Sequence, residues 1–164
     1  LLPTGNPMLD GVGPAAYAER LDIPDTTTSG AAKIVPLRQA ANDGFHIGHN
    51  DPDPRGMPAL GADGVTGGVV RDIWLDRAEH MIRYLEVEVS SASGKRNVLL
   101  PTAMIHISGS SGTVKVQSIL GSQFANVPSH KAADVVTRLE EDKISAYYAG
   151  GRLYATPERS EPVL

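Results

Sequence analysis

Prolines divide the first part of this 164-residue chain so closely that no long helix or strand fits there. Eight of the 12 prolines fall within residues 1–64, namely Pro3, Pro7, Pro14, Pro24, Pro36, Pro52, Pro54 and Pro58. Such a segment cannot build a core by itself, because it lacks a continuous apolar face. We therefore expect residues 1–64 to form an extended, irregular arm that packs on the following domain and on partners. One short helix at 14–20 and one short edge strand at 33–37 are expected within it.

Composition excludes several classes of protein. The hydrophobic fraction of 41% is too high for a fully disordered chain, and the absence of cysteine removes disulfides, thiol catalysis and thiolate metal sites. The formal net charge of −4 argues against nucleic acid as a partner, because a phosphate-binding surface needs excess Lys and Arg. No run of about 18 apolar residues is present, and the chain starts at Leu1 without a signal peptide. We expect a fragment or processed product, whose missing N-terminal segment could carry a membrane anchor.

Short strands replace the prolines after residue 64. The stretches 69–75, 81–89, 97–100, 104–108 and 113–117 are rich in aliphatic and β-branched side chains and are separated by polar turns. In the last two, Ile105, Ile107, Val114 and Val116 would share the inner face of a hairpin. This spacing predicts a mainly β domain over residues 65–164, built as a small antiparallel barrel or sandwich.

One short helix is expected to close this domain. Ile144, Tyr147 and Tyr148 recur at helical spacing within residues 141–149, and Glu140-Glu141-Asp142 places negative charge at the helix start. Gly150-Gly151 would end the helix, and the tail from residue 157 is expected to be loose.

One loop contains residues of the types that bind metals. His46, His49, Asp51 and Asp53 fall within a Gly/Pro-rich stretch, which would not fix two imidazoles as a helix does. We predict no metal site there, and a small hydrolase using His46 and Asp51 is the weakest of the functions considered.

A second group of polar residues surrounds a turn between two predicted strands. Asp72, Asp76, Glu79, His80 and Arg83 would lie in and around this turn. Carboxylates, an imidazole and a guanidinium held close together perturb one another's pKa values and can relay protons through water. The simpler interpretation is an exposed hairpin tip with surface salt bridges.

The same stretch carries a family resemblance. The chain resembles the H subunit of the purple-bacterial photosynthetic reaction centre in collinear blocks that cover nearly its whole length. The blocks are Pro3-Thr4-Gly5-Asn6-Pro7, Asp10-Gly11-Val12-Gly13-Pro14-Ala15, Lys33-Ile34-Val35-Pro36, Asp72-Ile73-Trp74-Leu75-Asp76 with Glu79, Arg83-Tyr84-Leu85-Glu86-Val87-Glu88, Gln123-Phe124-Ala125-Asn126-Val127-Pro128, Leu139-Glu140-Glu141-Asp142-Lys143-Ile144, Tyr148-Ala149-Gly150-Gly151 and Tyr154-Ala155.

This resemblance implies a PRC-barrel preceded by a long extended stretch, and a non-enzymatic role. The family's N-terminal membrane helix is absent from this chain, so membrane association would come from that missing segment or from partners. Those partners would be the L and M subunits, capped at the cytoplasmic face of the bacterial inner membrane, with the light-harvesting complex as a further candidate. The chain itself would bind no cofactor, since bacteriochlorophyll, bacteriopheophytin, quinone and iron belong to the partner subunits.

The resemblance also implies a role in proton uptake from the cytoplasm to the secondary quinone of the neighbouring subunit. Glu79, Asp76 and Arg83 match the family's proton-transfer positions. The family's proton entrance has an aspartate and two histidines, but Thr27, Ser29 and Ala31 stand at those positions here. His46 and His49 are therefore the candidates for an alternative entrance.

A function of another class uses the same fold. A PRC-barrel can serve as a soluble adaptor that binds protein partners, for example in RNA processing, and fold alone does not decide between the two. The long arm and the block from Glu140 to Gly151 favour the reaction-centre subunit, because a minimal adaptor would need neither.

Overall fold

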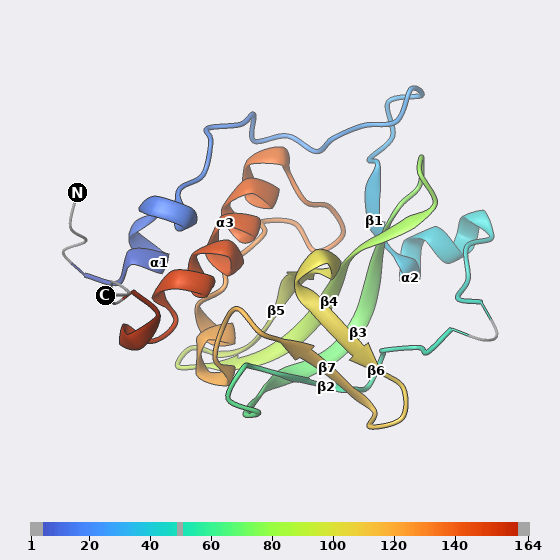
Figure 1. Cartoon of the computed structure of the whole chain (residues 1–164). Coiled ribbons are helices and arrows are strands. Elements are labelled where there is room, and N and C mark those ends of the chain that lie inside the picture. Colours follow the sequence, from blue (N-terminus) through green and yellow to red (C-terminus); the bar gives the residue numbers. More distant parts are fainter. Residues whose placement is uncertain (1–4, 49–50, 161–164) are drawn as a thin grey trace.

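Seven strands of the described residues form one mixed sheet at the centre of the fold (Figure 1). The computed structural model describes residues 5–48 and 51–160. The strands are β1 (Ile34–Pro36), β2 (Pro58–Leu60), β3 (Thr66–Asp76), β4 (Met81–Ser91), β5 (Gly94–Pro101), β6 (Ile105–Ser108) and β7 (Thr113–Val116). Their order is β5-β4-β3-β2-β7-β6, and β1 also pairs with β3. The fold is thus mainly β and resembles a PRC-barrel.

Two features of the sheet depart from the expected antiparallel barrel. β2 pairs with β7 in parallel, whereas the other pairings are antiparallel. Within the described residues β5 and β6 lie at the two ends of the strand order, so the sheet is not closed. The parallel pair arises because β2 comes from the arm and joins β7 from a distant part of the chain, a pairing that local turn signals do not encode.

The hairpin of β3 and β4 forms the centre of the sheet. Val70, Ile73, Leu85 and Val87 have at most 1% of their surface exposed. Because the arm and α3 cover what would otherwise be the solvent face, the alternate positions are buried too, including Tyr84. Shifts in the pairing register after Val70 and after Trp74 mark two irregularities, or β-bulges, in this hairpin.

The second hairpin, β6–β7, confirms the predicted pairing. Ile105 lies opposite Val116, and Ile107 opposite Val114. Val114 and Val116 are fully buried, while the two isoleucines are partly exposed and pack against the core from its edge.

The helix α3 (Arg138–Tyr154) is longer than the predicted 141–149. Its true start is a capping box: the Thr137 hydroxyl accepts from the Glu140 N–H, and the Glu140 carboxylate accepts from the Thr137 N–H. The expectation that Gly150 and Gly151 end the helix is wrong. Both glycines are buried inside the helix. There is no room for a side chain at either position: a Cβ on Gly150 would lie 2.5 Å from the Ala15 Cβ, and one on Gly151 would lie 2.4 Å from the Ser118 carbonyl oxygen. These glycines therefore let the arm and the loop after β7 pack closely on the helix.

The arm lies on the domain rather than apart from it. It contains α1 (Pro7–Asp10), η1 (Gly13–Ala15), α2 (Leu37–Ala40) and η2 (Ala41–Asp43), and it supplies β1 and β2 to the sheet. The prediction of a helix at residues 14–20 is thus wrong, since within that range only residues 14 and 15 belong to a regular element, the short turn η1. Figure 1 shows the arm crossing beside α3, with α1 packed on that helix.

The arm is also anchored at the start of α3. The Ile23 carbonyl accepts from the Arg138 N–H at 2.9 Å, and Asp22 accepts from the Thr137 hydroxyl at 2.7 Å and pairs with Lys131. The edge strand expected at 33–37 is confirmed as β1.

Two further 3-10 turns, η3 (Thr102–Met104) and η4 (Gly121–Asn126), lie between the elements, and a third, η5 (Pro157–Ser160), follows α3. The predicted loose tail therefore begins with one 3-10 turn, and residues 161–164 lie outside the described part of the chain. Among the described residues, no helix has the length and apolar character needed to cross a bilayer.

Candidate functional site

The turn between β3 and β4 is organised by Asp76. Its Oδ1 accepts hydrogen bonds from the N–H groups of Ala78 and Glu79, each at 2.9 Å, and its carbonyl accepts from the N–H of His80. His80 closes the turn with a positive φ of 55°. A short acceptor side chain at the start of the turn is what such a conformation requires, so Asp76 has a local structural role.

Lys33 joins the two carboxylates of this turn. Its Nζ lies 3.4 Å from Asp76 Oδ2 and 3.8 Å from Glu79 Oε1. Burial disfavours the ionised Asp76 carboxyl, but the Glu79 and Ala78 N–H groups and Lys33 outweigh it and lower the Asp76 pKa below its ordinary value. Asp76 is 1% exposed and Glu79 is 56% exposed at the side chain, so only Glu79 presents its carboxylate to water.

The loop that carries His46 lies against the same turn. The rings of Phe45 and His80 are 5.1 Å apart between centroids. A largely apolar cavity of about 370 Å³ is lined by both His46 and His80. Met81 and Ile82, at the start of β4, also line it and are 46% and 39% exposed. The structure thus brings His46 to the neighbourhood of the turn, while His49 lies outside the described residues.

Arg83 belongs to a different group. The pairing register passes from Leu75–Ile82 to Trp74–Tyr84, so Arg83 has no partner on β3, and such an irregularity redirects a side chain. Arg83 lines a polar cavity of about 250 Å³ together with Tyr84 and Glu141. The Tyr84 hydroxyl donates to Glu141 Oε1 at 2.7 Å. Burial raises the pKa of Glu141, although Tyr84 and Arg83 oppose that rise.

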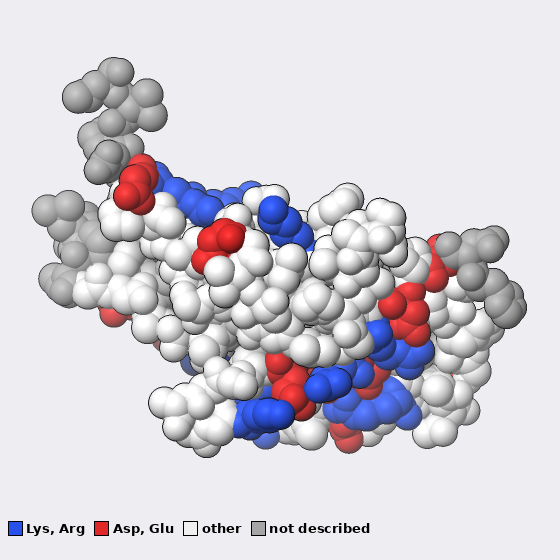
Figure 2. Space-filling model, turned by 90° about the horizontal axis from the view of Figure 1, so that it is seen from below, with Lys and Arg blue, Asp and Glu red and all other residues white. Residues whose placement is uncertain are grey.

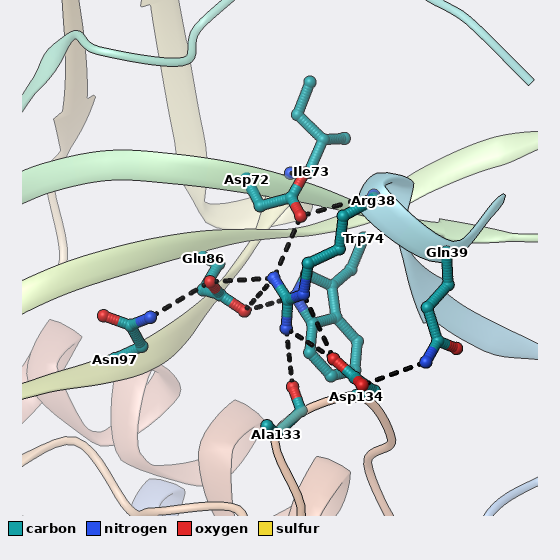
Figure 3. A network of polar contacts seen from close by, with 9 residues as sticks. All are labelled: Arg38, Gln39, Asp72, Ile73, Trp74, Glu86, Asn97, Ala133 and Asp134. Carbon is teal, nitrogen blue, oxygen red and sulfur yellow. Dashed lines mark hydrogen bonds and ion pairs between the residues drawn. The ribbon is translucent and has the colours of Figure 1, made fainter. Parts of the chain in front are cut away.

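A larger polar network lies behind the sheet and centres on Arg38 (Figure 3). Asp72 and Glu86 face each other across β3 and β4, a like-charge pair that would be destabilising alone. Arg38 Nη1 donates to Asp72 Oδ2 at 2.9 Å and to both Glu86 oxygens at 3.1 Å. Glu86 also accepts from the Trp74 indole at 3.0 Å and from the Asn97 amide at 3.1 Å.

The remaining donors of Arg38 reach the segment before α3. Its Nη2 donates to the Ala133 carbonyl and to Asp134 Oδ1, each at 2.8 Å, and Gln39 donates to the other Asp134 oxygen at 2.9 Å. Figure 3 shows the Arg38 guanidinium, which comes from the arm, surrounded by acceptors from two strands (Asp72 and Glu86) and one loop (Ala133 and Asp134). Because both buried carboxylates are satisfied, the network suits a structural clamp better than a proton carrier.

Sequence reasoning missed Arg38, Glu86, Glu141 and His130. His130 packs edge-to-face on Trp74 at 5.4 Å, and burial lowers its pKa against the opposing effects of Glu140 and Glu86. One signal was available: Glu86 is an acid in a strand otherwise rich in buried aliphatics, and such an acid needs a partner.

The loop of residues 46–53 shows no arrangement of metal ligands in its described part. Asp53 forms an ion pair with Arg55 at 2.7 Å, and the described residues contain no group of three or more His, Asp or Glu placed to hold a metal. On the face seen in Figure 2, Lys and Arg side chains lie beside Asp and Glu in the lower part, and further Lys and Arg side chains lie near the upper edge.

Comparison with protein families gives two matches in chain order. Residues 1–39 match the photosynthetic reaction centre H-chain N-terminal region, and residues 47–121 match the PRC-barrel domain. The first match covers the arm up to α2, and the second covers β2 to β7. An adaptor built from the barrel alone does not account for the first match. The two matches together therefore support an H-subunit-like protein of the photosynthetic reaction centre, with a PRC-barrel domain behind an H-chain arm.

Proposed function

We propose that this chain caps the L and M subunits at the cytoplasmic face of the photosynthetic membrane and supports proton uptake to the secondary quinone. The observation that carries the proposal is the Lys33–Asp76–Glu79 group at the β3–β4 turn. It combines a water-exposed carboxylate with a buried one and one shared cation. Bacteriochlorophyll, bacteriopheophytin, quinone and iron would all be held by the partner subunits.

The three predicted proton-transfer residues have different parts in this proposal. Glu79 is the group that exchanges protons with water, because its carboxylate is exposed at the turn. Asp76 stays ionised at neutral pH, so it holds Lys33 and the turn rather than carrying a proton. Arg83 acts on Glu141 instead and is not part of the Glu79 group.

The surroundings of Glu79 supply the remaining parts of the proposal. His46 lines the adjoining cavity and is exposed, so it is the candidate through which protons enter. Met81 and Ile82 place exposed apolar surface next to the turn, which suits burial against a partner subunit. Docking there would bring Glu79 to the interface, where water molecules can carry its proton onward.

The decisive experiment is Glu79→Gln in the assembled reaction centre. Gln keeps the shape of the side chain but cannot ionise, so the second, proton-coupled electron transfer to the secondary quinone should slow by about tenfold or more. The first electron transfer should change little, since it needs no net proton delivery. Flash kinetics measure both steps.

The matched control is Glu19→Gln, which removes one exposed carboxylate from the arm. It should leave both rates unchanged. An unchanged second step in Glu79→Gln, with its pH dependence intact, would reduce Glu79 to a solvated turn residue. Co-purification tests the assembly separately, because a complex with L and M absorbs in the near infrared through their bacteriochlorophyll.

A further inference from the structure

A cavity of about 360 Å³ lies between the β6–β7 hairpin and the C-terminal end of α3, away from the groups described above. It is lined by Ala103, Met104, Ile105, His106, Lys115, Gln117, Ser118, Arg152 and Arg159. No carboxylate is among these residues. In a chain with 19 acidic and 15 basic residues, a cavity that gathers three cations and no acid departs from the average charge.

Separate elements bring the basic side chains of this cavity together. His106 and Lys115 lie directly opposite each other on β6 and β7, so they share one face of the hairpin. Arg152 comes from the last turn of α3, and its Nη2 lies 3.5 Å from the Met104 sulfur. Arg159, from η5, is fixed by donating to the carbonyls of Ser118 at 2.7 Å and Gly151 at 2.8 Å.

These cations lack the acidic partners that others in the chain have. Within residues 5–48 and 51–160, no ion pair involves Lys115, Arg152 or Arg159. Lys33 and Arg38, by contrast, each contact two or more carboxylates. Three neighbouring positive charges without a counter-charge repel one another, and an anion between them would remove that cost.

Ser118 supplies an independent observation. It lines the cavity, it is 5% exposed, and its buried Oγ has no hydrogen-bond partner among the described residues. Buried hydroxyl groups in folded proteins are nearly always hydrogen-bonded, so such an atom calls for a ligand or an ordered water. The lining of this cavity therefore combines uncompensated cations with a residue whose hydroxyl group still needs a partner.

We propose that this cavity binds a phosphate group. Lys115 and Arg152 would contact its oxygens, His106 would donate an N–H, and Arg159, held by carbonyls, would contribute fixed positive charge. A phosphate monoester or diester fits the volume and presents several acceptor oxygens to donors from three directions. The same chemistry is found in free inorganic phosphate and in the headgroup of an anionic phospholipid such as phosphatidylglycerol.

Inorganic phosphate is the first probe. It is titrated into the 164-residue chain at neutral pH while NMR follows the His106 ring and the amides of residues 113–118. We expect saturable shifts there, and Lys115→Gln/Arg152→Gln should weaken the affinity by about tenfold or more. The control Arg71→Gln/Lys95→Gln removes the same charge from exposed positions on β3 and β5 and should bind like the parent.

Vesicles distinguish the two sources of the phosphate group. If the ligand is a lipid headgroup, the parent and the control should sediment with phosphatidylglycerol vesicles but not with phosphatidylcholine vesicles, and the Lys115/Arg152 variant should not. Phosphate binding without vesicle binding assigns the site to the free ion. Equal phosphate affinity of parent and double variant, with both folded by circular dichroism, overturns the proposal. Arg152→Lys, which keeps the charge, should recover much of the lost affinity.

Discussion

At the scale of single residues, Glu141 differs from the other carboxyl groups with shifted pKa values. Hydrogen bonds or ion pairs lower the pKa of Asp22, Asp53, Asp63 and Asp76, whereas burial raises that of Glu141. Glu141 is thus more easily protonated in the folded chain than in the unfolded chain. Its favourable contribution to stability is complete below its ordinary pKa of 4.5 and is lost as the pH rises through the higher folded value.

Glu141→Gln tests this directly. The variant cannot ionise but can still accept the Tyr84 hydroxyl, so its melting temperature should exceed that of the parent at neutral pH. The difference should shrink as the pH falls towards 4.5, because the parent then becomes protonated as well. Thermal unfolding over this pH range measures it, with the exposed Glu158→Gln as control. A difference that does not change with pH would contradict the assignment.

At the scale of elements, the β6–β7 hairpin shows how position within a cross-strand pair sets the cost of a buried charge. Ile107 and Val114 lie opposite each other, but Val114 is fully buried, while Ile107 is partly exposed and borders the cavity beside His46. Val114→Asp should therefore cost about 3 kcal/mol or more of unfolding free energy. Ile107→Asp should cost clearly less, because its carboxylate can reach water. Urea unfolding compares the two, and equal costs would show that the hairpin packs differently.

Sequence patterns predicted both hairpins, whose signals are local. The alternation in β4 and the polar turn between β6 and β7 each lie within a few residues, and both hairpins form as expected. The helix α3 was predicted too short, because its glycines were interpreted as a stop and the capping box from Thr137 to Glu140 was overlooked. Glycines that serve close packing and glycines that end helices look alike until the packing partner, here Ala15, is known.

At the scale of the whole molecule, the middle of the arm, residues 16–31, is held by a few contacts near the start of α3. Asp22 accepts from Thr137 and pairs with Lys131, which lowers its pKa. Limited proteolysis should cut the arm before the barrel. Asp22→Ala should make cleavage between residues 16 and 31 several-fold faster, while the neighbouring Asp25→Ala should have little effect, since the Asp25 side chain caps only the N–H of Thr26. Mass spectrometry of the fragments identifies the cleavage sites and their rates. If the Asp22 variant is cleaved between residues 16 and 31 no faster than the parent, these contacts do not hold the arm.

The parts of the site that involve distant residues could not be predicted from the chain alone. Asp76 and Glu79 are three residues apart, so their shared turn was predictable, but Lys33 enters from the arm. Arg83 lies near the start of β4 and was expected beside them, yet one irregularity in the pairing directs it to Glu141. Alternation assigns a face to each residue only while the register is regular, and a single extra residue reverses that assignment.

Arg38 joins the arm, two central strands and the segment before α3 through one side chain. If the arm detaches, Asp72 and Glu86 lose their shared cation in a dry environment, and if the segment before α3 detaches, Arg38 loses the Ala133 carbonyl and Asp134. The segments are therefore expected to open together in native-state hydrogen exchange, as one cooperative unit rather than as separate layers. An arm with little regular structure thereby gains the kinetic protection of the sheet on which it lies.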